Sequence, residues 1–92
     1  MKKELVLYIT TNCPVCRQVE KILDKGHVPY KTLNLDDASV YAEAVTSGLT
    51  VMSAPVLVIG RRTIYKAGLL HRDDLHGNLK QIVWEELGIE IE

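Results

Sequence analysis

Two short apolar runs, at residues 5–9 and 55–59, stand out in the pattern of hydrophobic and polar positions. Continuous apolar runs of this length are typical of strands that are buried on both faces. Residues 30–35 alternate between polar and apolar side chains, which predicts another strand. The second apolar run is followed by Gly60, which predicts a tight turn into a fourth strand at residues 62–66.

Three further segments have the periodicity of amphipathic helices. The first covers residues 14–25, where Pro14 suits the opening turn because the N–H that it lacks would have no partner there. Its apolar face is expected to hold Cys16, Val19, Ile22 and Leu23. The second covers residues 38–47, with Asp36 or Asp37 as the residue that caps it.

The third predicted helix covers residues 71–87. Its apolar stripe consists of Leu75, Leu79, Ile82, Val83 and Leu87. The tail at residues 89–92 is predicted to be frayed. The resulting order, β-α-β-α-β-β-α, predicts a single α/β domain over residues 1–92, with a four-stranded mixed sheet flanked by three helices.

Charge and segment length exclude some classes of function. The chain has 11 Lys and Arg residues against 12 Asp and Glu residues, which argues against a nucleic-acid-binding protein. The apolar stretch that ends at Ile9 is too short for a signal peptide, and no segment approaches the length of a membrane helix. We therefore expect a cytoplasmic protein without nucleic-acid or membrane partners. A pair of thiols in that compartment is expected to be catalytic or metal-binding rather than structural.

The two cysteines of the chain lie three residues apart, in the sequence Cys13-Pro14-Val15-Cys16. Cys13 precedes the predicted helix, where free N–H groups and the helix dipole favour an anionic sulfur and lower the pKa of a thiol. We expect Cys13 to be the exposed nucleophile. Cys16, on the apolar face, is expected to be less exposed and to attack a mixed disulfide held at Cys13.

A Cys-x-x-Cys pair also allows two other interpretations. Free cysteines are often inert core residues, but such residues need not stand together in front of a helix. Cys-x-x-Cys is also half of a common zinc site, and the chain has no second cysteine pair to complete it. His71 and His76 are five residues apart in a predicted helix and point in different directions. No metal ligand is therefore assigned, although a metal shared between two chains stays open.

The motif and its context resemble the thioredoxin superfamily, and the short chain is similar to glutaredoxins. The resemblance rests on Cys-Pro-Val-Cys after the first strand, on Ser53-Ala54-Pro55-Val56 before the hairpin, and on Gly68 before the last helix. It covers residues 5–87.

This resemblance implies a thioredoxin fold in which Pro55 is cis and lies against the cysteines. It further implies that the backbone of Ala54 pairs with an extended substrate and that Gly68 lets the substrate backbone approach closely. The expected substrate-binding residues are Thr11, Asn12, Pro14, Val15, Ala54, Pro55 and Gly68. The implied activity is that of a monomeric thiol–disulfide oxidoreductase that reduces protein or small-molecule disulfides.

The reductant is either glutathione or thioredoxin reductase. Glutathione-dependent glutaredoxins usually have Lys at the position of Thr10 and Tyr at that of Val15, so we expect thioredoxin reductase and no tightly bound cofactor. Two alternatives come from other classes of protein. One is a dimer that holds an iron–sulfur cluster through Cys13, and the other is a peptide-binding module with little turnover.

Overall fold

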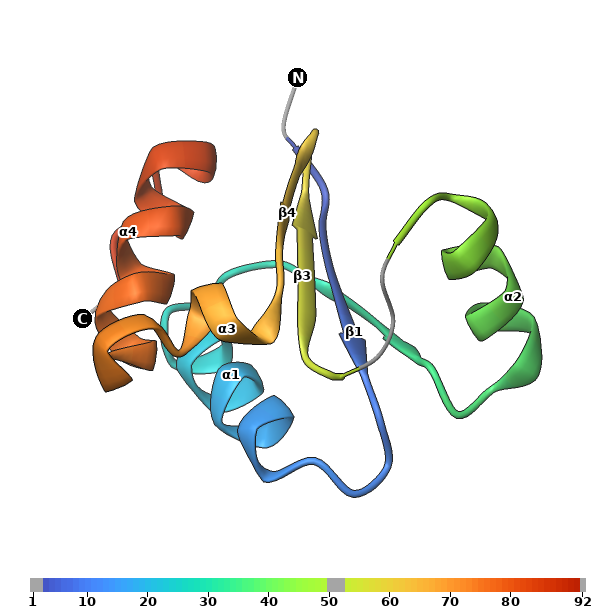
Figure 1. The fold of residues 1–92 in the computed structure, drawn as a ribbon. Coiled ribbons are helices and arrows are strands. Elements are labelled where there is room, and N and C mark those ends of the chain that lie inside the picture. The colour runs from blue at the N-terminus through green and yellow to red at the C-terminus, as the bar shows by residue number, and fades with distance from the viewer. Residues whose placement is uncertain (1–2, 50–52, 92) are drawn as a thin grey trace.

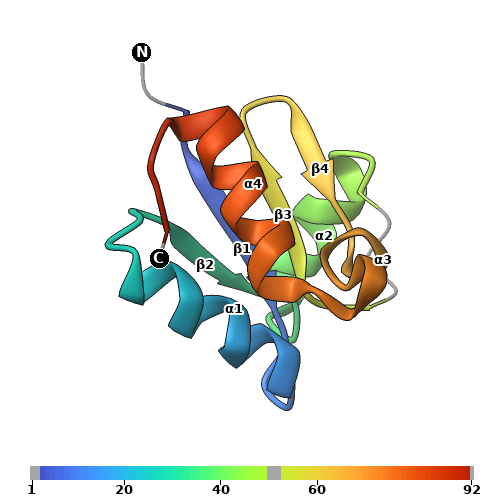
Figure 2. The ribbon, with the colours of Figure 1, turned by 90° about the vertical axis from the view of Figure 1, so that its left-hand side faces the viewer.

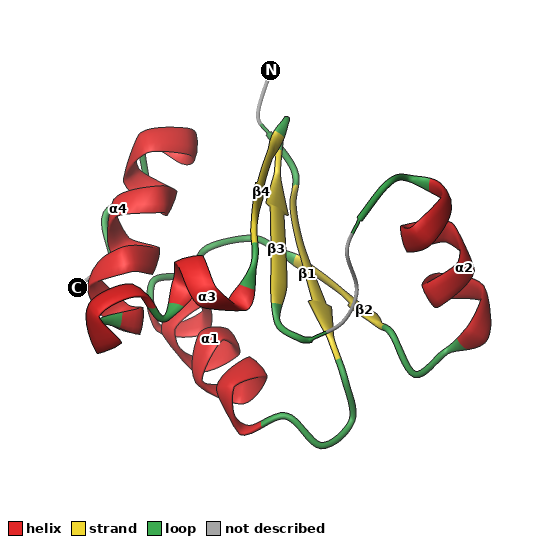
Figure 3. Ribbon diagram, in the orientation of Figure 1, coloured by secondary structure: helices red, strands yellow, loops and turns green. Residues whose placement is uncertain are grey.

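The computed structural model describes residues 3–49 and 53–91. Its sheet has four strands: β1 (Leu5–Ile9), β2 (Lys31–Asn34), β3 (Val56–Ile59) and β4 (Arg62–Ile64). The strand order is β2-β1-β3-β4. β1 pairs in parallel with β2 and antiparallel with β3, and β3 and β4 form a hairpin (Figure 3). The four predicted strands are confirmed, although β2, β3 and β4 are shorter than expected.

The helices lie on both faces of this sheet. They are α1 (Pro14–Lys25), α2 (Ala38–Thr46), α3 (Lys66–Leu69) and α4 (Leu75–Leu87), with a 3₁₀ turn at His71–Asp73. α1 and α4 cover one face, and α2 lies on the other (Figures 1 and 2). The main core forms under α1 and α4 and includes Leu5, Leu7, Leu57, Ile59, Val19, Leu23, Leu79 and Val83.

The face of the sheet toward α2 is less well covered. Side chains of a strand alternate between the two faces, so Leu5 and Leu7 point into the main core while Val6 and Tyr8 point the other way. Val6 and Tyr8 stay partly exposed, because α2 contributes Ala44 as its buried side chain. The expectation that β1 is buried on both faces of the sheet therefore holds for one face only.

The prediction of one helix over residues 71–87 was wrong at its start. Arg72 and Asp73 have φ values of 58° and 52°, which break the helical path, and α4 begins only after Asp74 caps it. The residues before the break form α3, and the break itself lies within the 3₁₀ turn, so the sheet is flanked by four helices instead of three. Asn78 stabilises the break, because its amide donates to the carbonyls of Leu69 and His71 at 2.8 and 2.9 Å.

The prediction of a frayed C-terminal tail was also wrong for the residues that the structure describes. The side chain of Ile91 is fully buried and packs beside Gly26 at the end of α1. Ile89 packs against the same core. Glu92 lies outside the described residues. Between residues 3 and 91, apart from 50–52, no helix combines the length and apolar character of a membrane span.

Candidate redox site

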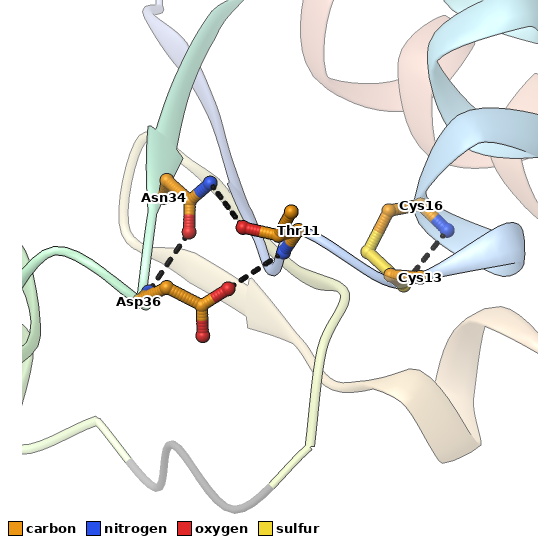
Figure 4. Close-up of a disulfide and its surroundings, with 5 residues drawn as sticks. All are labelled: Thr11, Cys13, Cys16, Asn34 and Asp36. Atoms are coloured by element: carbon orange, nitrogen blue, oxygen red, sulfur yellow. Dashed lines mark hydrogen bonds between the residues drawn. A yellow bond between two sulfur atoms is a disulfide. The ribbon is translucent and has the colours of Figure 1, made fainter.

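The two cysteines lie where the loop after β1 enters α1. Cys13 has extended backbone geometry and is the N-cap of α1, as predicted, and Pro14 occupies the first turn. The backbone N–H of Cys16 donates to the Cys13 sulfur across 3.1 Å. Cys13 and Cys16 are joined as a disulfide, with 5.2 Å between their Cα atoms (Figure 4). The helix start thus holds both sulfurs together and directs a donor at one of them.

Burial differs between the two sulfurs in the expected order, but Cys13 is not the exposed residue that was predicted. Cys13 is 8% exposed and Cys16 is 1% exposed. Both pack in a small cluster with Ala54, and Ile9 and Val15 cover its edge. Because Ala54 reaches this cluster from the loop before β3, the burial of Cys13 depends on a segment that is distant in the sequence.

The Ala54–Pro55 segment lies beside the cysteines, as the resemblance implied. The Ala54–Pro55 peptide bond is cis. Pro55 is fully buried, and Ala54 is part of the cysteine cluster. The structure therefore unites the two sequence motifs in one place.

The other predicted substrate-binding residues separate into two groups. Thr11, Asn12 and Pro14 lie next to Cys13, on the loop and first turn that lead into α1, and all three are exposed. Gly68 lies in α3, outside the cysteine cluster. A Cβ at Gly68 would lie 3.1 Å from Cγ2 of Ile64, so the absent side chain lets α3 pack closely against β4.

Sequence reasoning missed two polar residues that hold residues 10–12, the loop between β1 and α1 that is called the redox loop below. Asp36 accepts a hydrogen bond from the backbone N–H of Thr11 at 2.8 Å, and the Asn34 amide donates to the Thr11 hydroxyl oxygen at 3.4 Å (Figure 4). Hydrogen bonds from Thr11 lower the pKa of Asp36, and the side chain of Thr11 has a larger effect than its backbone. A signal was present, because Asn34 and Asp36 lie at the end of β2, and the carboxyl ends of parallel strands meet at one edge of a sheet.

Metal-binding side chains do not gather elsewhere in the described part of the chain. Within residues 3–49 and 53–91, no three His, Cys, Asp or Glu side chains lie together in a way that could hold a metal ion. The chemistry that the site itself offers is the making and breaking of one sulfur–sulfur bond.

Solved structures of other proteins have the same fold as this chain. A variant of a thioredoxin-like protein superposes with a TM-score of 0.63 at 20% identity, over 78% of this chain and 97% of that one. The NrdH-redoxin of Escherichia coli, described as glutaredoxin-like with a thioredoxin-like activity profile, gives 0.57 at 18% identity, over 67% and 80%. A buckwheat glutaredoxin in complex with glutathione gives 0.58 at 25% identity, over 82% and 74%. The thioredoxin fold that was predicted is thereby confirmed.

Sequence comparison gives the family. No curated protein sequence matches the chain. The family model described as Glutaredoxin matches residues 5–64, from the start of β1 to the end of β4. Because this match contains both cysteines and the Ala54–Pro55 bond, and the fold agrees with it, the chain belongs to the glutaredoxin family.

Proposed function

We propose that this protein is a dithiol–disulfide oxidoreductase that reduces disulfides of proteins or small molecules. The observation that carries the proposal is the Cys13–Cys16 disulfide at the N-terminal cap of α1, with a backbone N–H directed at the Cys13 sulfur. Membership of the glutaredoxin family supports this class of activity.

The reaction consists of two thiol–disulfide exchanges. In the first, the thiolate of Cys13 attacks one sulfur of the substrate disulfide, and the other substrate sulfur leaves as a thiolate. In the second, the Cys16 thiolate attacks the Cys13 sulfur of the mixed disulfide and expels the remaining substrate thiolate. The substrate gains two electrons, and the two thiols of the protein become the observed disulfide. A reductant then returns two electrons and two protons to the pair.

The different positions of the sulfurs support this division of roles. Cys13 stands at the helix cap, where first-turn N–H groups and the helix dipole stabilise negative charge on its sulfur. It is also the less buried of the two. Cys16 is almost inaccessible to a bulky substrate, yet it is within bonding reach of Cys13. It can therefore attack the mixed disulfide but is poorly placed to begin the reaction.

Ala54 is the proposed partner for an extended substrate. It lies against both cysteines, so a peptide that pairs with its backbone would place a substrate sulfur near Cys13. Thr11, Asn12, Pro14 and Val15 border the same position.

Thioredoxin reductase is the proposed reductant. Thr10 and Val15 replace the residues with which glutathione-dependent glutaredoxins usually hold glutathione. The segment with which such proteins usually bind the glutathione carboxylate also differs, because Ala67-Gly68 stands here in place of a pair of glycines.

Insulin reduction tests both parts of the proposal. The wild-type protein is supplied either with NADPH and thioredoxin reductase or with NADPH, glutathione and glutathione reductase. We expect turnover in both systems and faster turnover in the first. Cys13→Ser should abolish turnover in each. Activity that survives in Cys13→Ser would contradict the assignment of the nucleophile, and faster turnover with glutathione would contradict the proposed reductant.

A further inference from the structure

The loop between β1 and α1 determines where the Cys13 sulfur lies. Only residues 10–12 connect the end of β1 to the helix cap, and Thr11 is exposed. The cap interaction requires the Cys13 sulfur to stay close to the N–H of Cys16, which is 3.1 Å away. A contact that fixes this loop from outside would therefore help the helix start to hold the sulfur in place.

A closed ring of three hydrogen bonds joins this loop to the end of β2. The backbone N–H of Thr11 donates to Oδ2 of Asp36 at 2.8 Å. The backbone N–H of Asp36 donates to Oδ1 of Asn34 at 2.8 Å, and Nδ2 of Asn34 donates to Oγ1 of Thr11 at 3.4 Å. Figure 4 shows the ring at the strand ends, beside the loop that leads to Cys13.

The sheet anchors this ring. Asn34 pairs with Ile9 in the parallel register of β1 and β2. The next residue, Leu35, donates its backbone N–H to the carbonyl of Ile9 at 2.7 Å. The bond between Thr11 and Asp36 therefore continues the cross-strand pairing past the ends of both strands and into the redox loop.

We propose that Asp36 is a positioning residue of the redox site, whose carboxylate holds the loop at Thr11 and so keeps the Cys13 sulfur at the cap of α1. This deepens the proposed function, on which it rests for the role of Cys13. An aspartate is ionised at neutral pH, and the ionised carboxylate is the stronger acceptor for the Thr11 N–H. The hydrogen bonds from Thr11 lower the pKa of Asp36 further.

Asp37 provides a matched control. It carries the same charge one residue further along, but its carboxylate caps α2 by accepting from the N–H groups of Ser39 and Val40. Asp36→Ala and Asp37→Ala each remove one exposed carboxylate, and only Asp36→Ala breaks the bond to Thr11. Asp36→Asn removes the charge and keeps an acceptor oxygen.

The experiment measures the rate at which iodoacetamide alkylates Cys13 as a function of pH. Each variant is made in the Cys16→Ser background, which leaves Cys13 as the single thiol of the chain. Loss of the cap alignment should slow alkylation of Asp36→Ala at neutral pH about threefold and move the midpoint of its pH profile upward. If the only effect of Asp36→Ala were the loss of a nearby negative charge, alkylation would become faster, because removing that charge favours the Cys13 thiolate.

We expect Asp37→Ala to react like the parent and Asp36→Asn to recover most of the parental rate. Asp36→Ala reacting like Asp37→Ala, or faster than the parent, would overturn the proposal. Alkylation needs neither a disulfide substrate nor a reductant. A chain that fails to reduce insulin but shows slow alkylation in Asp36→Ala would thus refute the proposed function alone. A chain that reduces insulin without this effect would refute the role of Asp36 alone.

Discussion

The packing of the C-terminal tail on the end of α1 predicts a strong coupling between Gly26 and Ile91. A Cβ at Gly26 would lie 2.9 Å from Cγ1 of Ile91, which is closer than such atoms approach. The φ of Gly26 is −85°, so alanine fits the backbone there. Gly26→Ala should therefore gain about 0.4–1 kcal/mol from a less flexible unfolded chain. It should lose about 1–3 kcal/mol from overpacking against Ile91. We expect a net destabilisation of about 1 kcal/mol.

Removing the Ile91 side chain should reverse the sign of that effect. Ile91 is fully buried, and shortening a buried isoleucine to alanine costs about 2–5 kcal/mol. We expect the lower end of this range, because a tail can shift to fill part of the space. With the Ile91 side chain gone, Gly26→Ala has no clash and should be neutral or stabilising. The two substitutions should thus be coupled by about 2 kcal/mol.

Urea unfolding of the wild type, both single variants and the double variant measures this coupling. All four proteins are kept in the disulfide form, so that the redox state does not contribute to the free energy of unfolding. The reasoning fails if Ile91→Ala costs less than about 0.5 kcal/mol, well below the range for a buried isoleucine. It fails equally if Gly26→Ala has the same effect in both backgrounds.

Three further predictions concern polar interactions. Burial and the hydrogen bond to Asp24 raise the pKa of Tyr30 to about 12, so its contribution to stability should be complete below pH 10 and lost as the pH rises through 12. An absorbance titration should show the ionisation of Tyr30 near pH 12, and Asp24→Asn should move it to lower pH; an unchanged titration would contradict this. Asp37→Ala should cost about 1 kcal/mol in urea unfolding, because α2 loses its cap, and a cost near zero would count against the capping role. Asn78→Ala should cost about 1–3 kcal/mol and speed hydrogen exchange in residues 66–73, because two carbonyls lose their donor; unchanged exchange there would argue against that role.

Elements defined by local patterns could be predicted from the sequence. The apolar run of β1 and the proline at the start of α1 gave the observed bounds of β1 and the observed start of α1. The start of α4 could not be predicted in this way. Arg72 and Asp73 adopt left-handed backbone geometry that glycine or asparagine would have signalled, and the side chain that stabilises the break, Asn78, comes later in the chain. The burial of Ile91 was missed because chain ends are usually frayed, and no local pattern shows that this tail packs against the end of α1.

The candidate site was predictable to a similar extent. The spacing of Cys13 and Cys16 and the distant Ala54-Pro55 pair are enough to identify its centre from the sequence. The burial of Cys13 was not predictable, because it depends on how tightly Ala54 packs against the helix start. Asp36 was expected only as a helix cap, since its contact with the redox loop arises from the pairing of β1 with β2.

The central claim is that Cys13 attacks and Cys16 resolves. Reduced Cys16→Ser and reduced Cys13→Ser proteins are each incubated with a peptide disulfide, and intact masses are then measured without added reductant. The account predicts a stable adduct of one peptide on Cys13 in Cys16→Ser and almost none in Cys13→Ser, because the remaining Cys16 is 1% exposed. Equal adducts on both variants, or an adduct only on Cys16, would contradict it.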